Sequence, residues 1–147
     1  IQGKKVIDAG TGTGILAILC RMKGASSVLA YDIDERSVAN TLDNMALNHC
    51  TAINVKLGDS RILEDEAADY DLLIANINRN ILLHDMPVFR RTLKRGGRML
   101  LSGFYLQDAD AICHSAEELG LHPVKQDSHN QWTAILFETD AAGGMDV

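Results

Sequence analysis

Lys4 to Gly14 of this chain read KKVIDAGTGTG, and this stretch decides the fold. Its first half, Lys5–Ala9, has the composition of a short buried strand, and the apolar residues 15–22 directly after the glycines predict a helix. Glycines at 10, 12 and 14 let the backbone turn sharply and leave no Cβ between it and a ligand. The stretch therefore predicts the opening of a nucleotide-binding βαβ unit, with free N–H groups of the helix start facing the ligand.

Apolar runs and helix-period segments alternate along the rest of the chain. Further strands are predicted at 27–31, 53–57, 70–77 and 98–104, and further helices at 34–48, 79–94 and 107–119. Within the helix at 79–94, Pro87 predicts a kink or a break, and Gly96 and Gly97 are expected to end the helix. This alternation is typical of a parallel sheet with helices on both faces.

Two final strands, at 121–126 and 133–138, have no helix between them and are expected to form an antiparallel hairpin joined through residues 128–130. The fold class is therefore α/β, with a Rossmann-like, doubly wound, mainly parallel sheet of seven strands and a C-terminal antiparallel hairpin. We expect one domain over residues 1–140. The Gly- and Ala-rich residues 141–147 are expected to form a flexible tail.

The composition excludes several classes of function. With 14 basic and 20 acidic residues the net charge is -6, which argues against a nucleic-acid or membrane surface. No apolar run approaches the roughly 20 residues of a membrane span, and no signal-peptide pattern opens the chain. Three cysteines without CxxC spacing indicate free thiols and a cytoplasmic protein, and the five histidines lack metal-ligand spacing, so no metal site is expected.

The ligand of such a sheet binds beyond the carboxyl ends of the strands, next to the first strand. The residues at those ends are therefore the candidate site residues: 8–14 with Gly10, Thr11 and Gly12, then Asp32, residues 58–59 with Asp59, Asn76, and residues 102–103. At Asp59 two interpretations remain open, a turn former and a ligand contact.

The glycine spacing bears on which nucleotide is bound. In the dinucleotide fingerprint GxGxxG the third glycine would stand at position 15, which is Ile15, and the chain contains no GxxxxGK[ST] phosphate loop. A carboxylate at Asp32 can accept both ribose hydroxyls of either NAD or S-adenosylmethionine. Asp59 can receive an adenine amino group, and Asn76 lies where a sulfonium methyl would be. Because no proton donor for hydride transfer stands at these strand ends, methyl transfer is favoured over NAD chemistry.

Four segments carry a family resemblance: VIDAGTGTGILAI, YDIDERSV, the NI at 76–77, and RGGRMLLSGF. Together they resemble a class I methyltransferase, and more narrowly the PrmA family, which methylates amino groups of ribosomal protein L11. A late Asn-x-Trp-x-Ala at 130–134 adds to the resemblance. It implies S-adenosylmethionine contacts at Gly10, Asp32 and Asn76, and implies contacts at Thr11, Gly12 and Asp59 less strongly. Asn76 would also orient the incoming amine.

The resemblance further implies a protein N-methyltransferase whose partner is a ribosomal protein, with no nucleic-acid or membrane partner. The family carries a separate N-terminal substrate-recognition domain, which we expect to be absent from a chain that begins at Ile1. The alternatives are an NAD-dependent oxidoreductase, a methyltransferase of a small molecule or RNA, and a non-catalytic cofactor-binding module. Asn80 is expected on the polar face of its helix, and Trp132 in packing of the hairpin.

Overall fold

The computed structural model describes residues 1–140, and the predicted tail at 141–147 lies outside the described residues. The strands are β1 (Lys5–Ala9), β2 (Ser27–Asp32), β3 (Ile53–Leu57), β4 (Tyr70–Asn76), β5 (Leu93–Tyr105), β6 (Leu121–His129) and β7 (Trp132–Thr139). The α-helices are α1 (Ile15–Met22), α2 (Glu35–Leu47), α3 (Arg79–Thr92) and α4 (Ala109–Glu118), and the short 3₁₀ helices are η1 (Ser60–Asp65) and η2 (Leu106–Asp108).

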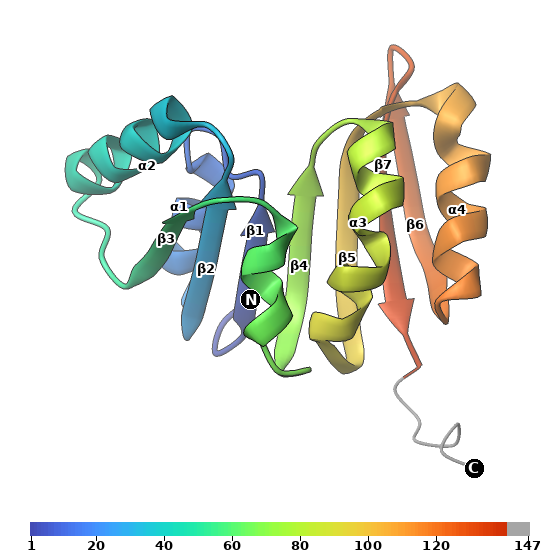
Figure 1. Cartoon of the computed structure of the whole chain (residues 1–147), viewed down its shortest axis with the longest axis horizontal. Coiled ribbons are helices and arrows are strands. Elements are labelled where there is room, and N and C mark those ends of the chain that lie inside the picture. The colour runs from blue at the N-terminus through green and yellow to red at the C-terminus, as the bar shows by residue number, and fades with distance from the viewer. Residues whose placement is uncertain (141–147) are drawn as a thin grey trace.

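All strands of the described chain join one sheet in the order β3-β2-β1-β4-β5-β7-β6 (Figure 1). The pairs from β3 through β5 are parallel, whereas β7 pairs antiparallel with both β5 and β6. β1 lies between β2 and β4, which is the point where the strand order reverses and where such sheets bind their ligands. The predicted fold class is confirmed, with the antiparallel hairpin at the C-terminal edge.

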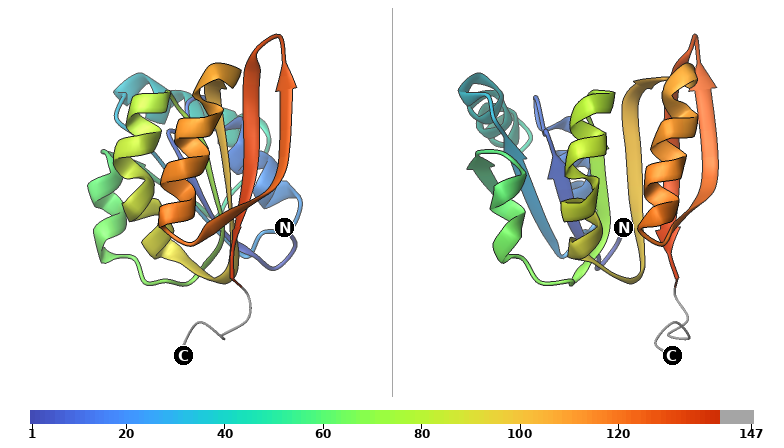
Figure 2. Two further views of the ribbon diagram at one scale, coloured as in Figure 1. Left: turned by 90° about the vertical axis from the view of Figure 1, so that its right-hand side faces the viewer. Right: turned by 45° about the vertical axis from the view of Figure 1, so that its right-hand side comes forward.

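Helices cover both faces of the sheet, so each strand near its centre is buried on both sides. α3 and α4 lie in front of the sheet in Figure 1, and Figure 2 shows them packed beside each other on that face. Adjacent residues of β1 belong to two separate cores: Val6 packs in a cluster with Ile18 of α1, and Ile7 in a larger one with Leu82 and Phe89 of α3. Burial on both faces explains why the central strands are nearly continuous apolar runs.

No helix within residues 1–140 is long and apolar enough to cross a membrane. All three cysteines are free thiols, with Cys20 and Cys50 buried and Cys113 half-buried. The prediction of unpaired cysteines is therefore confirmed.

The boundary between α3 and β5 differs from the sequence prediction. α3 ends at Thr92, and β5 begins at Leu93, which pairs with Tyr70 of β4. The predicted helix end at Gly96 and Gly97 is wrong, because both glycines lie inside β5 at a register irregularity. A Cβ at Gly97 would lie 2.8 Å from the Lys94 carbonyl oxygen, so the glycine permits a close backbone approach within the strand.

Pro87 does not break α3, which runs without interruption from Arg79 to Thr92. Met86 and Phe89, on either side of the proline, are fully buried in the core beneath the helix. Burial of these two side chains offsets the backbone hydrogen bond that a proline removes from a helix interior.

The C-terminal hairpin is longer and tighter than predicted. β6 extends to His129 and β7 starts at Trp132, so the turn is Asn130 and Gln131 rather than residues 128–130. Both turn residues have positive φ, +50° and +75°. Positive φ at both positions matches the right-handed twist of the two strands, which fixes a two-residue connection.

Candidate functional site

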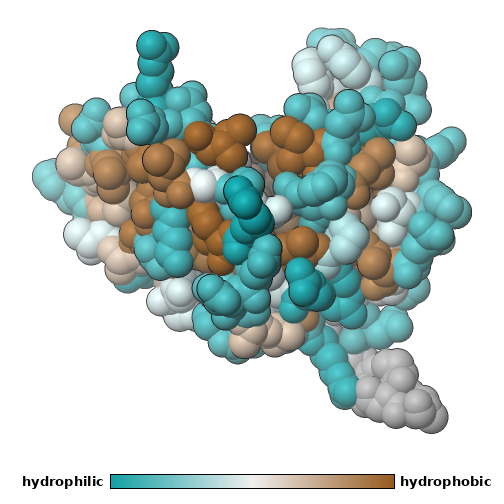
Figure 3. Space-filling model, viewed as in Figure 1, coloured by the Kyte–Doolittle hydropathy of each residue, from teal (hydrophilic) through white to brown (hydrophobic). Residues whose placement is uncertain are grey.

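A cleft of about 800 Å³ opens at the carboxyl ends of the parallel strands. Figure 3 shows this face hollowed at its upper edge, between α2 and the tip of the β6–β7 hairpin, with apolar surface along the hollow. The volume lies in the usual range of small-molecule sites. The residues that line the cleft are Gly10, Tyr31, Asp32, Ile33, Asp59, Ser60, Arg61, Asn76, Ile77, Asn80, Ile81, His84 and Asp85.

The glycine turn above β1 uses its own N–H groups within the protein. Gly10 lines the cleft, but the Gly12 N–H donates to Asp32 Oδ2 at 2.9 Å and the Thr11 N–H to the Tyr31 carbonyl at 2.9 Å. The N–H groups of residues 11 and 12 are therefore engaged within the protein and are not free for a ligand. The three glycines all have positive φ, so their contribution is the shape of the turn.

Beneath the turn, Asp8 is buried and accepts a hydrogen bond from Thr11 Oγ1 at 2.8 Å. Burial raises the pKa of Asp8 to about 6, although the Thr11 hydroxyl opposes part of that rise. Thr11 itself is buried against Asp8 and does not line the cleft. The structure thus places Thr11 as a support of the turn rather than at the cleft surface.

Asp32 at the end of β2 is fixed by two backbone donors. Its Oδ2 accepts from Gly12 and its Oδ1 from the Asp34 N–H at 3.0 Å. Each carboxylate oxygen can accept two hydrogen bonds, so each retains one site while the side chain faces the cleft. This is the arrangement expected for a carboxylate that receives a pair of neighbouring hydroxyls.

α2 holds the other side of the glycine turn. Thr41 Oγ1 donates to the Gly12 carbonyl at 3.0 Å, and Asn44 Nδ2 donates to the Thr13 carbonyl at 2.8 Å. Thr41 is fully buried beside Gly14, where a Cβ would lie 2.6 Å from the threonine methyl. Helix and turn therefore pack too closely for any other residue at position 14.

Asp59 lines the cleft from the end of β3, with its carboxylate already paired. Both of its oxygens accept from Arg61 Nε, at 3.0 and 3.2 Å, and Oδ1 also accepts the Arg61 backbone N–H. These hydrogen bonds from Arg61 lower the pKa of Asp59 below its ordinary value. Asp59 is thus the cap of η1 and also lines the cleft, so its role as a turn former is confirmed and its contact with a ligand stays a prediction.

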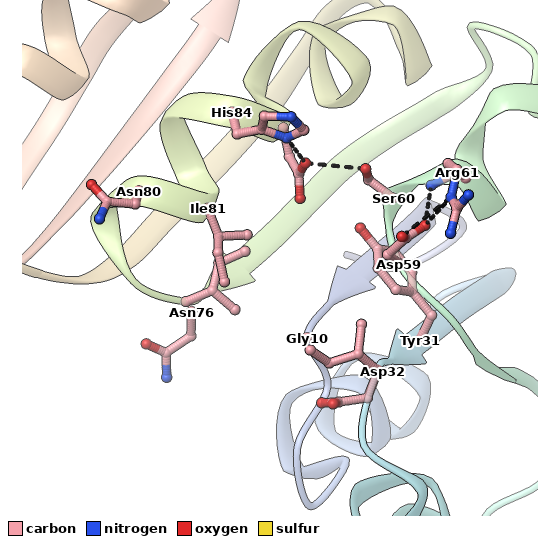
Figure 4. Close-up of a pocket in the computed structure, with 13 residues that line it drawn as sticks. Gly10, Tyr31, Asp32, Asp59, Ser60, Arg61, Asn76, Asn80, Ile81 and His84 are labelled. Carbon is pink, nitrogen blue, oxygen red and sulfur yellow. Dashed lines mark hydrogen bonds and ion pairs between the residues drawn. The ribbon is translucent and has the colours of Figure 1, made fainter.

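Asn76 ends β4 and projects into the cleft opposite Gly10 and Asp32 (Figure 4). Within residues 1–140 its side chain makes no hydrogen bond, so both amide atoms are available to a ligand. A Cβ on Gly103, at the irregular point of β5, would lie 2.8 Å from Asn76 Oδ1. The glycine gives the Asn76 side chain its room.

Several cleft residues were not singled out from the sequence. Tyr31 stands inside a strand, and Ser60, His84 and Asp85 come together only because η1 packs against α3. Asn80, expected on a polar helix face, lines the cleft. The spacing of apolar residues along a helix indicates which face is buried, but it does not indicate which polar residues border a cavity.

Trp132 lies outside the cleft lining. Its ring stacks on Tyr105 with the ring centroids 4.6 Å apart, and both side chains are about half exposed. Because Tyr105 ends β5, the stack packs the hairpin against its neighbouring strand, which is the packing role predicted for Trp132.

Comparison with known proteins decides the family. The family described as "Ribosomal protein L11 methyltransferase (PrmA)" matches residues 1–140. The chain belongs to the PrmA family. It is similar to the ribosomal protein L11 methyltransferases of Porphyromonas gingivalis (50% identity, 96% of this chain and 48% of that protein) and Phocaeicola vulgatus (47% identity, 93% and 48%).

The chain spans about half the length of these curated relatives. Among solved structures it resembles the ribosomal protein L11 methylase from Lactobacillus delbrueckii subsp. bulgaricus, with a TM-score of 0.89, 29% identity, and coverage of 95% of this chain and 72% of that chain. A TYW2 from M. jannaschii in complex with AdoMet, at 16% identity and a TM-score of 0.72 over 93% of this chain and 68% of that chain, shares the fold. The family prediction is confirmed, and the alternative of an NAD-dependent oxidoreductase is not supported.

The residues that line the cleft fit an S-adenosyl nucleoside. Asp32 keeps an acceptor site on each oxygen, and Ile33, Ile77 and Ile81 supply apolar surface along the same cleft. The Tyr31 hydroxyl, also in the lining, is a buried polar atom without a partner in the described chain. No group of three His, Cys, Asp or Glu among the described residues is arranged to hold a metal ion.

Proposed function

We propose that residues 1–140 form the S-adenosylmethionine-dependent methyltransferase domain of a protein that methylates amino groups of ribosomal protein L11. The observation that carries the proposal is the match of the PrmA family over residues 1–140. The cleft at the carboxyl edge of the sheet supports it, because Gly10, Asp32, Asp59 and Asn76 all line that cleft. The unpaired cysteines support a cytoplasmic location, where the ribosomal substrate would be met.

S-adenosylmethionine, when bound, supplies a methyl group that is already activated by the sulfonium. Asp32 would hold the ribose through the two acceptor sites that its backbone donors leave free. Gly10 lets the backbone of the turn lie against the ligand, since it presents no side chain to the cleft. Asp59, with its carboxylate capped by Arg61, borders the end of the cleft formed by β3.

Asn76 is the residue proposed to orient the attacking amine. Its Oδ1 can accept a hydrogen bond from a neutral amine N–H and leave the nitrogen lone pair free to attack. A lysine side chain has an ordinary pKa near 10.4, so its deprotonation at pH 7.4 costs about 4 kcal/mol. The Asn76 amide does not titrate, so its contribution is alignment, a term that can reach roughly 7–11 kcal/mol in well-oriented reactions.

The experiment is transfer of tritiated methyl from S-adenosylmethionine to purified ribosomal protein L11 by the full-length protein. We expect label on lysine or N-terminal amino groups, located by mass spectrometry, and a large loss of rate in Asn76→Ala. Asn40→Ala, on the exposed face of α2, is the matched control and should keep the rate. Label that appears only on RNA or a small molecule, or none at all from a protein that binds the cofactor, would contradict the proposed substrate.

A further inference from the structure

The cleft has a polar floor made by Tyr31 of β2, Ser60 of η1 and Asp85 of α3. Ser60 Oγ donates to Asp85 Oδ1 at 3.1 Å, and His84 Nδ1 lies 2.8 Å from the same oxygen. Figure 4 shows the bonds from His84 and from Ser60 to one carboxylate oxygen, and the Tyr31 hydroxyl pointing toward the same part of the cleft. All of these residues line the cleft, and none of them has a role in the proposed transfer step.

The Tyr31 hydroxyl is buried and has no partner in the part of the chain that the structure describes. Tyr31 as a residue is only 4% exposed. Burial raises the pKa of Tyr31, and the charges of Asp85, Asp59 and Asp8 raise it further, so the hydroxyl keeps its proton at neutral pH. A buried hydroxyl without a partner costs free energy unless a ligand supplies one, so it is an available donor.

Asp85 offers the matching acceptor. Both of its hydrogen bonds go to Oδ1, and Oδ2 has no partner among residues 1–140. The residue is 9% exposed, so its surroundings exclude most water. A carboxylate oxygen of this kind forms a strong, charge-assisted hydrogen bond with any N–H that reaches it.

Donor and acceptor therefore line the same cleft as the apolar side chains of Ile33, Ile77 and Ile81, and the charge of Asp85 is close enough to raise the pKa of Tyr31. A flat ring between apolar side chains would have to present an N–H to Asp85 and an acceptor to Tyr31. Adenine has this edge, because its exocyclic amino group adjoins a ring nitrogen that only accepts. Hypoxanthine and guanine have a carbonyl oxygen in place of that amino group, so the oxygen would face the Asp85 carboxylate.

We propose that Asp85 and Tyr31 recognise the adenine base of the cofactor, with Asp85 Oδ2 accepting the amino group and the Tyr31 hydroxyl donating to the adjacent ring nitrogen. This inference rests on the proposed function, since it assigns the base of the same cofactor. Asp59, the acceptor expected from the sequence, already accepts hydrogen bonds from Arg61 on both oxygens, and its side chain is 46% exposed against 12% for Asp85, so Arg61 and water compete with a ligand there. Asp85 is the carboxylate of the cleft that keeps an oxygen without such a partner.

Calorimetric titration with S-adenosylhomocysteine and S-inosylhomocysteine, which differ at the amino group, tests the assignment. We expect the full chain to prefer the adenosyl compound by about 10- to 100-fold, the ratio given by one hydrogen bond to a charged group. Asp85→Asn should reduce this preference to about threefold or less, because an amide can also donate to the hypoxanthine oxygen. Asp59→Asn is the matched carboxylate-to-amide control and should keep the preference.

Tyr31→Phe gives a second, independent readout. Removing the unpartnered hydroxyl should raise the free energy of unfolding of the ligand-free protein. It should at the same time weaken the binding of S-adenosylhomocysteine by about tenfold. This variant decides the matter if Asp85→Asn does not fold. The assignment would be overturned if Asp85→Asn kept the preference for the adenosyl compound, including the case in which its affinity for both compounds fell equally. It would also be overturned if Asp59→Asn lost the preference instead. Failure of the unmodified protein to bind either compound would refute the proposed function itself.

Discussion

Gly10→Ala tests whether the glycine turn is closed by contact with the segment after β4. A Cβ at position 10 would lie 2.6 Å from Ile77 Cγ2, and the backbone there has a φ of +69°. Left-handed backbone costs an alanine about 1–2 kcal/mol, and overpacking adds about 1–3 kcal/mol. The expected loss of unfolding free energy is therefore about 2–5 kcal/mol, and affinity for S-adenosylhomocysteine should fall because Ile77 lines the cleft.

Gly120→Ala is the matched control, because Gly120 has a φ of +78° and no atom within 4 Å of its Cβ position. Its free energy of unfolding should fall only by the cost of the left-handed backbone, about 1–2 kcal/mol, and its affinity for S-adenosylhomocysteine should stay unchanged. Ile77→Leu removes the branch at Cβ that clashes, so the double variant with Gly10→Ala should recover much of the steric part. Urea unfolding followed by circular dichroism measures the unmodified protein, the three single variants and the double variant. Equal losses in Gly10→Ala and Gly120→Ala, or no recovery in the double variant, would refute the argument.

Three further predictions follow from individual side chains. The pKa of Asp8 is about 6 in the folded protein against an ordinary 3.8, so the folded state binds more protons than the unfolded state between these pH values. The free energy of unfolding should therefore fall as the pH rises from 4 to 7, by about 3 kcal/mol more than in Asp8→Asn. Urea unfolding at each pH measures this difference. Phe104→Ala should cost about 3–5 kcal/mol and its neighbour Tyr105→Ala about 1 kcal/mol or less in the same assay, because Phe104 is 1% exposed and Tyr105 is 47% exposed. Gly103→Ala places a Cβ 2.8 Å from both Asn76 Oδ1 and the Ile77 carbonyl oxygen, so Asn76 and the backbone after β4 must shift and the methyl-transfer rate should fall by about 100-fold. A rate equal to that of the unmodified protein would contradict the proposed role of Asn76.

The central part of the fold was predictable because local and long-range signals agree there. The apolar residues before Gly10 are buried on both faces of the sheet, and a glycine-rich turn between strand and helix has few alternative conformations. The strand ends follow from that topology, which is why Gly10, Asp32, Asp59 and Asn76 were found in one cleft. Parallel strands bring their carboxyl ends to one edge whatever their separation in sequence.

The features that were not predicted share one physical cause, which is contact between residues far apart in the sequence. A pair of glycines such as Gly96 and Gly97 is typical of a helix end. Here Leu93 pairs with Tyr70 of β4, so the residues that follow it form strand β5. Asp85 and Ser60 lie 25 residues apart and meet only through the packing of η1 against α3. Neither a turn propensity nor a hydrophobic period contains that information.

Binding of S-adenosylhomocysteine, measured by calorimetry, tests the central claim that this cleft holds the methyl donor. The unmodified protein should bind S-adenosylhomocysteine. The affinity of Asp32→Ala should be lower by about 100-fold or more, because two hydrogen bonds from the ligand to a charged acceptor disappear. Asp34→Ala, which removes the cap of α2 at Arg36 but lies outside the cleft lining, should keep the affinity. Absence of binding to the unmodified protein, or an affinity unchanged by Asp32→Ala, would contradict the account.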